Sequence, residues 1–455
     1  MAYHSDSENS RRKFIGKIAK GVMASALLPA AASANEKTSS ILLRKEEKFG
    51  PNDQIQIALI GAGGMGNADT DTAITIPGVK LIAACDLYDG RLEQARKKYG
   101  AGIFTTRDYK EILARKDIDA VIIATPDHWH KDIAVDAMNN GKSVYVEKPM
   151  IQNINEGTAV VEAQKRTNKI LQVGSQGMSS LGNDKAKQLF ESGAIGQLNY
   201  VEGFWARNTP GGAWQYDMPA DASTQNIDWK RFLKDKPNVA FDPRRFFRWR
   251  CFRDYGTGVG GDLFVHLLSS LHYIISSMGP TKIMATGGLR YWKDGRDVPD
   301  VLLGMFDYPQ TEKHPAFNLS LRVNFVDSTR DGSYFRLVGN EGYMIVDWEK
   351  VTLYRNFSYP PDNYATILKQ KQYAPDYDRK KMPEPDSTIY TVEQGYKGAH
   401  YDHFYNWARA IRGGKAVIED AAFGYRAAAP AVLCNDSYFQ EKAIKWDPFK
   451  MQLIS

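Results

Sequence analysis

The chain has 455 residues, of which 43% are hydrophobic and 25% are charged, values that are ordinary for globular proteins and exclude a largely disordered chain. Its formal net charge is +6, and five basic and two acidic residues within positions 1–34 leave only about +3 for the rest, so we expect no nucleic-acid partner. The three cysteines are too few for a disulfide framework, and no cysteine and histidine spacing is typical of a zinc site.

The first 34 residues have the organisation of a removable export signal. Ser10-Arg11-Arg12-Lys13-Phe14-Ile15 is a twin-arginine pattern, a moderately apolar run follows from Gly21 to Ala32, and Ala32-Ser33-Ala34 is a small-residue cleavage site. The apolar run is too short to span a membrane. We therefore predict export to the periplasm by the twin-arginine machinery, with no stable membrane span. A disordered basic leader is the alternative.

A polar stretch at 35–52 is predicted to be a linker, and residues 53–175 then alternate apolar strands with amphipathic helices. This is the pattern of a doubly wound parallel α/β sheet. The expected strands lie at 55–60, 79–85, 119–125 and 143–146, and the expected helices at 91–99, 109–116 and 131–140. Loops at the carboxyl edge of such a sheet are where ligands bind.

The turn after the first of these strands has the spacing of a dinucleotide site. Gly61 permits the tight turn, Gly63 lets the backbone approach a pyrophosphate, and Gly66 lets the following helix pack closely on the strand. The next strand ends at Asp86, where a carboxylate can accept hydrogen bonds from the adenosine ribose. Because that carboxylate would repel an added phosphate, we predict NAD rather than NADP, although Arg91 lies nearby and softens the repulsion.

Residues 176–455 have a different pattern and are predicted to form a second, α+β domain with a large, mostly antiparallel sheet. The expected strands lie at 197–204, 282–287, 301–306, 318–324, 334–339 and 343–346, and the expected helices at 184–191, 262–277 and 400–411. Residues 355–397, rich in Tyr, Pro and Lys, are predicted to be a long loop or insertion.

Three residues could carry proton chemistry beside a nicotinamide. Lys148 follows a strand and precedes a stiffening proline, so it can donate to a substrate oxygen, although a surface lysine is the alternative. On a helix, Asp262 and His266 would share one face, where the imidazole can accept a hydroxyl proton while the carboxylate orients it or binds a neighbouring hydroxyl. An ordinary surface contact is the alternative for that pair.

Taken together, these motifs resemble the Gfo/Idh/MocA family of nicotinamide-dependent oxidoreductases. The resemblance rests on the glycine turn, Asp86, the Ala124-Thr125-Pro126 loop with His130, Glu147-Lys148-Pro149, and the Asp-x-x-x-His pattern from Asp262 to His266. It implies catalytic roles for Lys148, Asp262 and His266. It also implies cofactor contacts from Gly61, Gly63, Gly64, Met65, Gly66, Asp86, Thr125, Pro126, Trp129, His130, Glu147, Lys148 and Gln176.

The family also implies an activity, namely hydride transfer between a sugar, polyol or glycoside carbon and a tightly held cofactor. An alternative comes from relatives with twin-arginine signals, the NAD-dependent α-N-acetylgalactosaminidases, which cleave glycosides through transient oxidation. Their counterpart of Lys148 is generally apolar, which favours a dehydrogenase here. We expect a small carbohydrate substrate and a homo-oligomer formed through the open sheet face. We expect no metal, because His128 and His130 have no third ligand at motif spacing.

Other residues have weaker expectations. We expect the aromatic side chains at 205–249, interleaved with arginines, to be mostly core, with one or two contacting ligand. His272 is expected to pack in the interior, and His314 and His4 to be exposed.

Overall fold

The computed structural model describes residues 37–46, 50, 53–329, 332–355, 385–414 and 416–454. The predicted twin-arginine signal at 1–34, including Arg11 and Arg12, lies outside these residues, as does His4. Within the described segments, no helix is long and apolar enough to cross a membrane.

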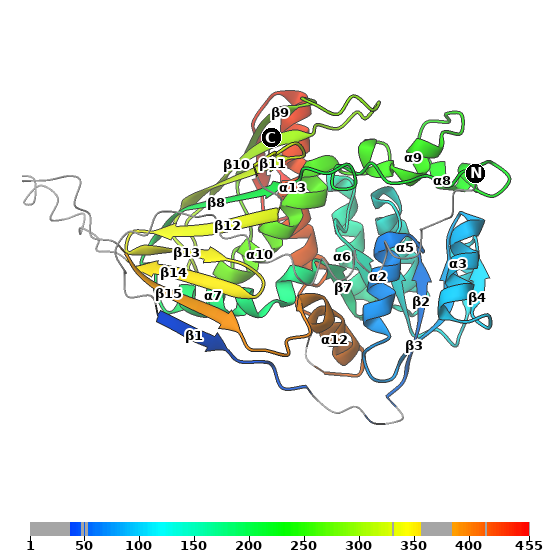
Figure 1. The fold of residues 1–455 in the computed structure, drawn as a ribbon, viewed down its shortest axis with the longest axis horizontal. Coiled ribbons are helices and arrows are strands. Elements are labelled where there is room, and N and C mark those ends of the chain that lie inside the picture. The colour runs from blue at the N-terminus through cyan, green and yellow to red at the C-terminus, as the bar shows by residue number, and fades with distance from the viewer. Residues whose placement is uncertain are drawn as a thin grey trace, which may run out of the picture.

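The N-terminal domain is the predicted doubly wound sheet. Six parallel strands have the order β4-β3-β2-β5-β6-β7, and helices cover both faces (Figure 1). The strands are β2 (Ile55–Ile60), β3 (Val79–Cys85), β4 (Phe104–Thr106), β5 (Ala120–Ile123), β6 (Ser143–Glu147) and β7 (Leu171–Gly174). The helices are α2 (Gly64–Ala73), α3 (Asp89–Tyr99), α4 (Tyr109–Ala114), α5 (His130–Asn139) and α6 (Gly157–Thr167). Strands β2, β5 and β6 are buried along nearly their whole length, as the inner strands of parallel sheets are, and they therefore form apolar runs in the sequence.

The second domain is built on a mixed sheet of eleven strands. Most neighbouring strands are antiparallel, as predicted. The strand order is β1-β15-β14-β13-β12-β8-β11-β10-β9-β16-β17, and only β1 with β15 and β8 with β11 are parallel. The strands are β8 (Leu198–Ala206), β9 (Lys282–Gly288), β10 (Val301–Tyr308), β11 (Phe317–Asn324), β12 (Gly332–Gly339), β13 (Gly342–Val346), β14 (Lys350–Arg355), β15 (Asp386–Val392), β16 (Ile444–Asp447) and β17 (Gln452–Leu453), with β1 (Lys37–Ile41) at the edge.

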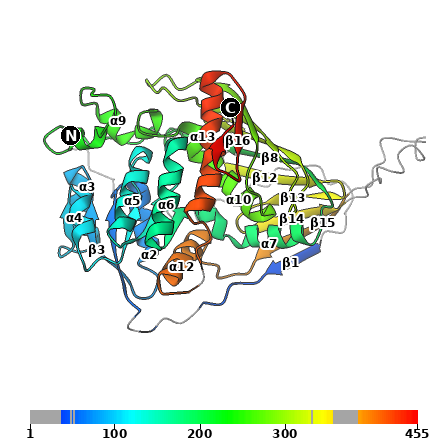
Figure 2. The ribbon, with the colours of Figure 1, turned by 180° about the vertical axis from the view of Figure 1, so that it is seen from behind.

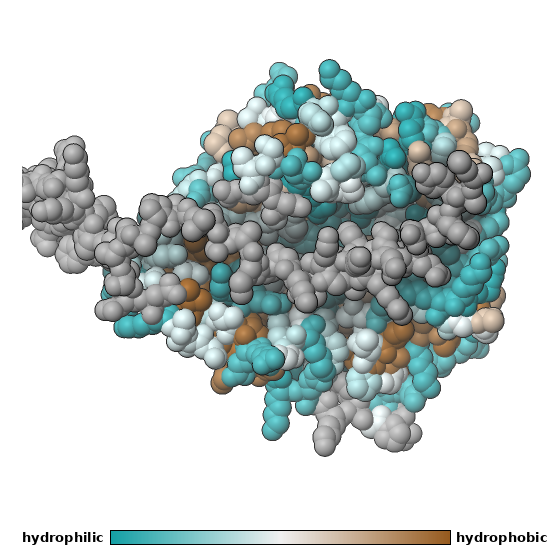
Figure 3. Space-filling model, viewed as in Figure 1, coloured by the Kyte–Doolittle hydropathy of each residue, from teal (hydrophilic) through white to brown (hydrophobic). Residues whose placement is uncertain are grey.

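Helices α7 (Leu181–Glu191), α10 (Val265–Ile275) and α13 (Ala421–Gln440) lie against one face of this sheet (Figure 2). The two short helices α8 (Trp229–Leu233) and α9 (Pro243–Phe247) instead extend over the top of the N-terminal domain (Figures 1 and 2). Hydrophilic side chains predominate on the face shown in Figure 3, with scattered apolar patches between them.

Two predicted loop segments contain strands. The stretch predicted as a linker contributes β1, and the predicted long loop contributes β15, which pairs with it in parallel. Sequence patterning missed β1 because it is an edge strand whose side chains are exposed except at Ile41, so no apolar alternation marks it. Residues 356–384 of the predicted loop lie outside the described residues.

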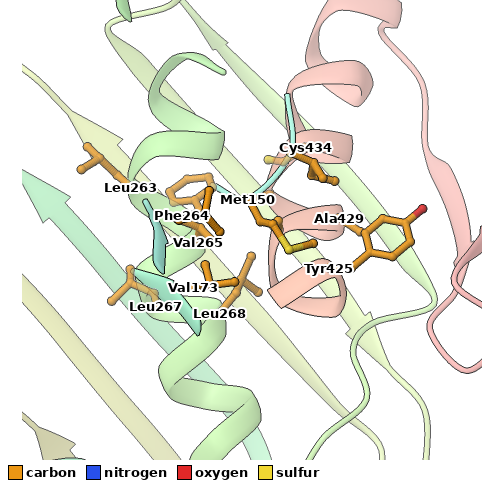
Figure 4. Close-up of a cluster of buried hydrophobic side chains, with 14 of the residues drawn as sticks. Met150, Val173, Leu263, Phe264, Val265, Leu267, Leu268, Tyr425, Ala429 and Cys434 are labelled. Carbon is orange, nitrogen blue, oxygen red and sulfur yellow. The ribbon is translucent and has the colours of Figure 1, made fainter. Parts of the chain in front are cut away.

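Each of the two hydrophobic cores contains residues from both sides of the predicted domain boundary at residue 175. Helix α12 (Ala399–Ile411) comes from the C-terminal part of the chain but packs on the N-terminal sheet, where Phe404 stacks on Tyr145 at 4.2 Å. Figure 4 shows the second junction, where Val173 and Met150 of the N-terminal domain lie against Leu268 and Tyr425. The two domains therefore share buried surface, and the cleft between them has fixed walls.

Candidate active site

The glycine turn is packed as the dinucleotide motif requires. Gly61 has φ of +97°, and a Cβ there would lie 2.6 Å from the Ala124 backbone. A Cβ on Gly66 would lie 2.1 Å from the Gly61 carbonyl oxygen, whereas one on Gly64 would meet only open space. The N-cap residue of α2, Gly63, has no side chain to accept from the first-turn N–H groups. These donors and the helix dipole therefore favour an anion in front of the turn.

Asp86 is held firmly at the end of β3. One carboxylate oxygen accepts from the Ala62 N–H at 2.9 Å and the other from the Tyr88 N–H at 3.0 Å. Arg91 Nη1 lies 3.5 Å from the first of these oxygens, so the carboxylate remains beside a cation. This fixes an acceptor at the position where the adenosine ribose would lie.

A cavity of about 560 Å³ runs along the carboxyl edge of the N-terminal sheet. Its floor includes the glycine turn, Met65, Asp86, Thr125, Pro126 and Trp129, which are predicted cofactor residues. Its roof comes from the second domain and includes Tyr216, Phe246, Phe247, Trp249 and Arg250. The shape, the uncapped helix end and the fixed acceptor fit an extended dinucleotide.

The roof belongs to a segment that we call the strap, residues 207–256. It is tied to the N-terminal domain by backbone hydrogen bonds from the Asp228 N–H to the Leu87 carbonyl at 2.9 Å and from the Asp89 N–H to the Asn226 carbonyl at 3.0 Å. The Arg91 guanidinium lies over the rings of Phe246 and Phe247. The strap therefore closes over the adenosine end of the cavity, next to Asp86.

The three predicted catalytic residues lie close together in the structure. Lys148 Nζ donates at 2.8 Å both to the Asp262 carboxylate and to the Asp262 carbonyl, and both side chains are 9% exposed. Burial alone would raise the pKa of Asp262, but Lys148 and Arg250 hold it well below its usual range. This buried ion pair holds the ammonium group against Asp262 of the second domain.

Asp262 and His266 begin the helix as predicted, but Asp262 lies in a π-helical turn (Gly260–Phe264) that precedes α10. The Asp262 side chain faces Lys148 and Arg250. Among the described residues, His266 Nδ1 is buried without a hydrogen-bond partner, so an Asp262 hydrogen bond does not orient the imidazole through this nitrogen. The Trp205 ring, 5.3 Å away, packs against it instead.

The imidazole of His266 is held in its neutral form. Burial lowers the pKa of His266 to about 3, Lys148 and Arg207 act in the same direction, and Asp262 opposes them. At neutral pH, His266 can therefore accept a proton. Burial therefore keeps the His266 imidazole neutral, and packing against the Trp205 ring holds it in position without a hydrogen-bonded carboxylate.

Several predicted cofactor residues hold the walls of the site. The two ring nitrogens of His130 lie 2.8 Å from the Thr125 and Pro149 carbonyl oxygens, so this histidine ties the loop after β5 to the turn after β6. Gln176 Nε2 donates to Glu147 at 2.6 Å. In the structure, His130, Glu147 and Gln176 are buried supports of the site.

Buried carboxyl groups gather behind the turn that carries Lys148. Burial, reinforced by Asp69, raises the pKa of Glu147 to about 8. Asp69 Oδ1 lies 2.8 Å from His400 Nε2, and its pKa is raised well above its usual value by burial. Burial also raises the pKa of Glu419 to about 8. These groups keep protons in the folded protein at neutral pH.

Some site residues had no sequence signal. Arg250 and Tyr216 line the cavity, and Asp127 accepts a hydrogen bond from the Thr257 hydroxyl at 2.8 Å. None of them lies in a motif. The prediction for the aromatic segment is confirmed in part, since Trp214 is buried while Phe246, Phe247 and Trp249 reach the cavity.

The prediction that His314 is exposed is wrong. It is 3% exposed, because Nε2 lies 3.0 Å from the Ser277 hydroxyl and Phe317 packs on the ring. His272 is buried as expected, against Tyr308. Within the described residues, there is no group of three or more His, Cys, Asp or Glu side chains that could hold a metal ion.

Comparison with known proteins agrees with this architecture. Residues 55–175 match the family model described as an oxidoreductase family with an NAD-binding Rossmann fold, and residues 187–445 match that family's C-terminal alpha/beta domain. Among solved structures, levoglucosan dehydrogenase in complex with NADH and levoglucosan is similar in fold, with a TM-score of 0.62, 18% identity, and coverage of 86% of this chain and 99% of that chain.

Curated relatives match over part of the chain. Scyllo-inositol 2-dehydrogenase (NAD(+)) of Bacillus subtilis (strain 168) is 36% identical over 152 residues, which is 33% of this chain and 44% of that protein. A glycosyl hydrolase family 109 protein of Shewanella baltica (strain OS155 / ATCC BAA-1091) is 34% identical over 125 residues, 26% of this chain and 27% of that protein. The chain thus matches less than half the length of either relative.

The raised pKa of Glu147 predicts how stability depends on pH. A carboxyl group whose pKa is about 8 when folded and 4.5 otherwise binds more protons in the folded state, so stability is greatest below pH 4.5 and decreases as pH rises to about 8. We expect Glu147→Gln to remove roughly 3 kcal/mol of this decrease between pH 5 and 8, measured by urea unfolding. Exposed Glu162→Gln is the control and should keep the parental slope. A parental slope in Glu147→Gln would contradict the assignment.

Proposed function

The chain belongs to the Gfo/Idh/MocA oxidoreductase family, and from this premise we propose that it transfers hydride between a sugar, polyol or glycoside carbon and a tightly held NAD. The observation that carries the proposal is the grouping of Lys148, Asp262 and neutral His266, which Arg250 connects to a cavity that fits a dinucleotide, since Arg250 borders the cavity and contacts Asp262. Bound NAD supplies the hydride acceptor.

The residues of the chain move the proton and stabilise the charge on the substrate oxygen. As the carbon loses hydride, its hydroxyl must lose a proton, and the neutral imidazole of His266 is the base that takes it. Lys148 donates to the same oxygen while negative charge develops on it. Asp262 keeps Lys148 in place through the 2.8 Å contact and is available to a neighbouring hydroxyl. In the reverse direction, the same groups return the proton.

NAD is favoured over NADP by the fixed carboxylate at Asp86, which would repel a ribose phosphate. Arg91 lies beside that carboxylate but is also held by two phenylalanine rings. Tight retention is supported by the strap, which closes the adenosine end through two backbone hydrogen bonds. The cofactor is then recycled in place by a second substrate.

A redox-assisted glycoside hydrolase is not favoured. That chemistry uses the same cofactor and only a transient oxidation, and the similarity to a family 109 protein covers 26% of this chain. Lys148 is placed to handle a free hydroxyl, as a dehydrogenase needs. Aglycone release from aryl glycosides without net cofactor change would instead support the hydrolase.

The catalytic roles predict a separation of turnover from cofactor binding. Lys148→Met and His266→Ala should each lower turnover about a hundredfold or more while the nucleotide content stays near that of the parent. Nucleotide content is read from absorbance after denaturation, and turnover from cofactor absorbance with sugars and polyols. Exposed Lys442→Met is the control. Near-parental turnover in His266→Ala would remove the base assignment.

We also propose export to the periplasm by the twin-arginine machinery, which accepts folded proteins and would allow the cofactor to be loaded first. The proposal rests on the sequence at 1–34. Replacing both Arg11 and Arg12 with Lys should leave the precursor in the cytoplasm, measured by cell fractionation and immunoblotting. Undiminished export of this variant would contradict the proposal.

We propose that a second copy of the chain packs on the open face of the large sheet. On β9 and β10, Met284, Leu303 and Met305 are 40%, 43% and 56% exposed and border a hollow of about 590 Å³. Apolar side chains exposed together on a sheet face are typical of an interface.

If this face is the interface, a single negative charge placed on it should weaken the association of the two copies. Met305→Glu should shift the protein towards the monomer in light scattering at micromolar concentration, because the carboxylate would lose its water on association. Gln452→Glu, exposed on the edge strand β17, should not. A monomeric parent would contradict the proposal.

A further inference from the structure

Arg250 is a cavity residue that the proposed proton chemistry leaves without a role. It comes from the strap, just before the π-helical turn, and its side chain is 22% exposed. Its Nε donates to the Asp262 carboxylate at 3.1 Å, and its guanidinium lies over the Trp249 ring at 4.2 Å. No hydrogen bond is made by its two terminal amino groups to any described residue, and Arg250 lines the same cavity as Thr125 and Pro126.

The surroundings of Arg250 leave a surplus of positive charge. Lys148 and Arg250 share one oxygen of Asp262, so one carboxylate faces two cations. Arg207 is a third cation that acts on both Asp262 and His266. A further carboxyl group nearby, that of Asp127, has a pKa raised by burial to about 7, so it offsets this positive charge only in part.

A neutral sugar would leave this surplus without a partner. A guanidinium with its terminal donors directed to a cavity is suited to a planar carboxylate, which accepts two parallel hydrogen bonds. The contact with Trp249 keeps the guanidinium plane fixed, so little side-chain entropy is lost when the carboxylate binds. The cofactor's pyrophosphate is accounted for elsewhere, at the uncapped N-terminus of α2.

We propose that Arg250 binds the carboxylate of the substrate and that the substrate is therefore a sugar acid, such as a hexuronate, rather than a neutral sugar. This inference rests on the proposed function and narrows its substrate class. Arg250 holds the carboxylate end, while Lys148 and His266 act on a hydroxyl-bearing carbon of the same molecule.

The proposal is tested by comparing acids with their uncharged esters on the nucleotide-loaded protein. Galacturonate and glucuronate, their methyl esters and the neutral hexoses are each offered, and reduction of the bound cofactor is followed at its absorbance band. We expect the parent to react at least about 10-fold faster with an acid than with its ester. Arg250→Met should lower the rate with the acid roughly 30-fold and the rate with the ester by less than about 3-fold.

Two further variants isolate the guanidinium. Arg250→Lys keeps the charge but loses the paired donors, so it should recover only part of the preference for the acid. Arg244→Met removes the same kind of charge from the neighbouring helix α9, where the side chain is 53% exposed and paired with Asp242, and should behave as the parent. Equal effects of Arg250→Met on acid and ester would overturn the proposal, and so would a parent that reacts equally with both.

A binding measurement separates this inference from the proposed function. Calorimetric titration of the nucleotide-loaded protein with each acid and ester needs no turnover. Acid binding that is lost in Arg250→Met, without any cofactor reduction, would support the carboxylate site while removing the dehydrogenase. Reduction by neutral hexoses alone would support the dehydrogenase and overturn the carboxylate site. Loss of nucleotide from Arg250→Met would assign Arg250 to the cofactor and also overturn it.

Discussion

The buried ion pair between Lys148 and Asp262 joins the two domains at the point where chemistry would occur. Lys148 directly follows strand β6 of the nucleotide domain, and Asp262 lies in the π-helical turn that leads into α10 of the second domain. The contact of 2.8 Å between groups that are each 9% exposed fixes the ammonium and leaves His266 neutral beside it. Removing one partner of such a pair leaves an uncompensated buried charge, at a cost of roughly 3–5 kcal/mol. The ion pair therefore sets the position of the ammonium group, while burial is the main cause of the neutral state of His266.

The second constraint is the strap, residues 207–256, which makes the cofactor groove a covered cavity. It hydrogen-bonds to the loop after β3 at one end and carries Arg250 to Asp262 at the other. A single segment thus contacts both the adenosine end and the reacting end. Because helix α12 and the packing around Tyr425 also join the domains, the cleft walls are braced on two further sides. This arrangement supports a cofactor that stays bound while substrates exchange.

The sequence predicts the parts whose signal is local. Gly61, Gly66 and the apolar strands identify the nucleotide domain. Gly61 has a positive φ, Gly66 leaves no room for a side chain, and the strands are buried on both faces, so each feature restricts the residue type locally. Edge strand β1 was missed because its polar side chains carry no burial pattern. The π-helical turn at Asp262 and the free donors of Arg250 depend on contacts between segments far apart in the chain, which no spacing reveals. His314 was misjudged for the same reason, since Ser277 and Phe317 bury it.

The most direct test of a retained, redox-active NAD is to identify the nucleotide released from the purified protein before and after incubation with sugars, polyols and sugar acids. The account predicts NAD in near-equimolar amount, released oxidised from the untreated protein and reduced after incubation with a substrate, without any nucleotide added to the buffer. Protein that releases no nucleotide, or releases only NADP, would contradict the cofactor assignment. NAD whose oxidation state no compound changes would contradict hydride transfer.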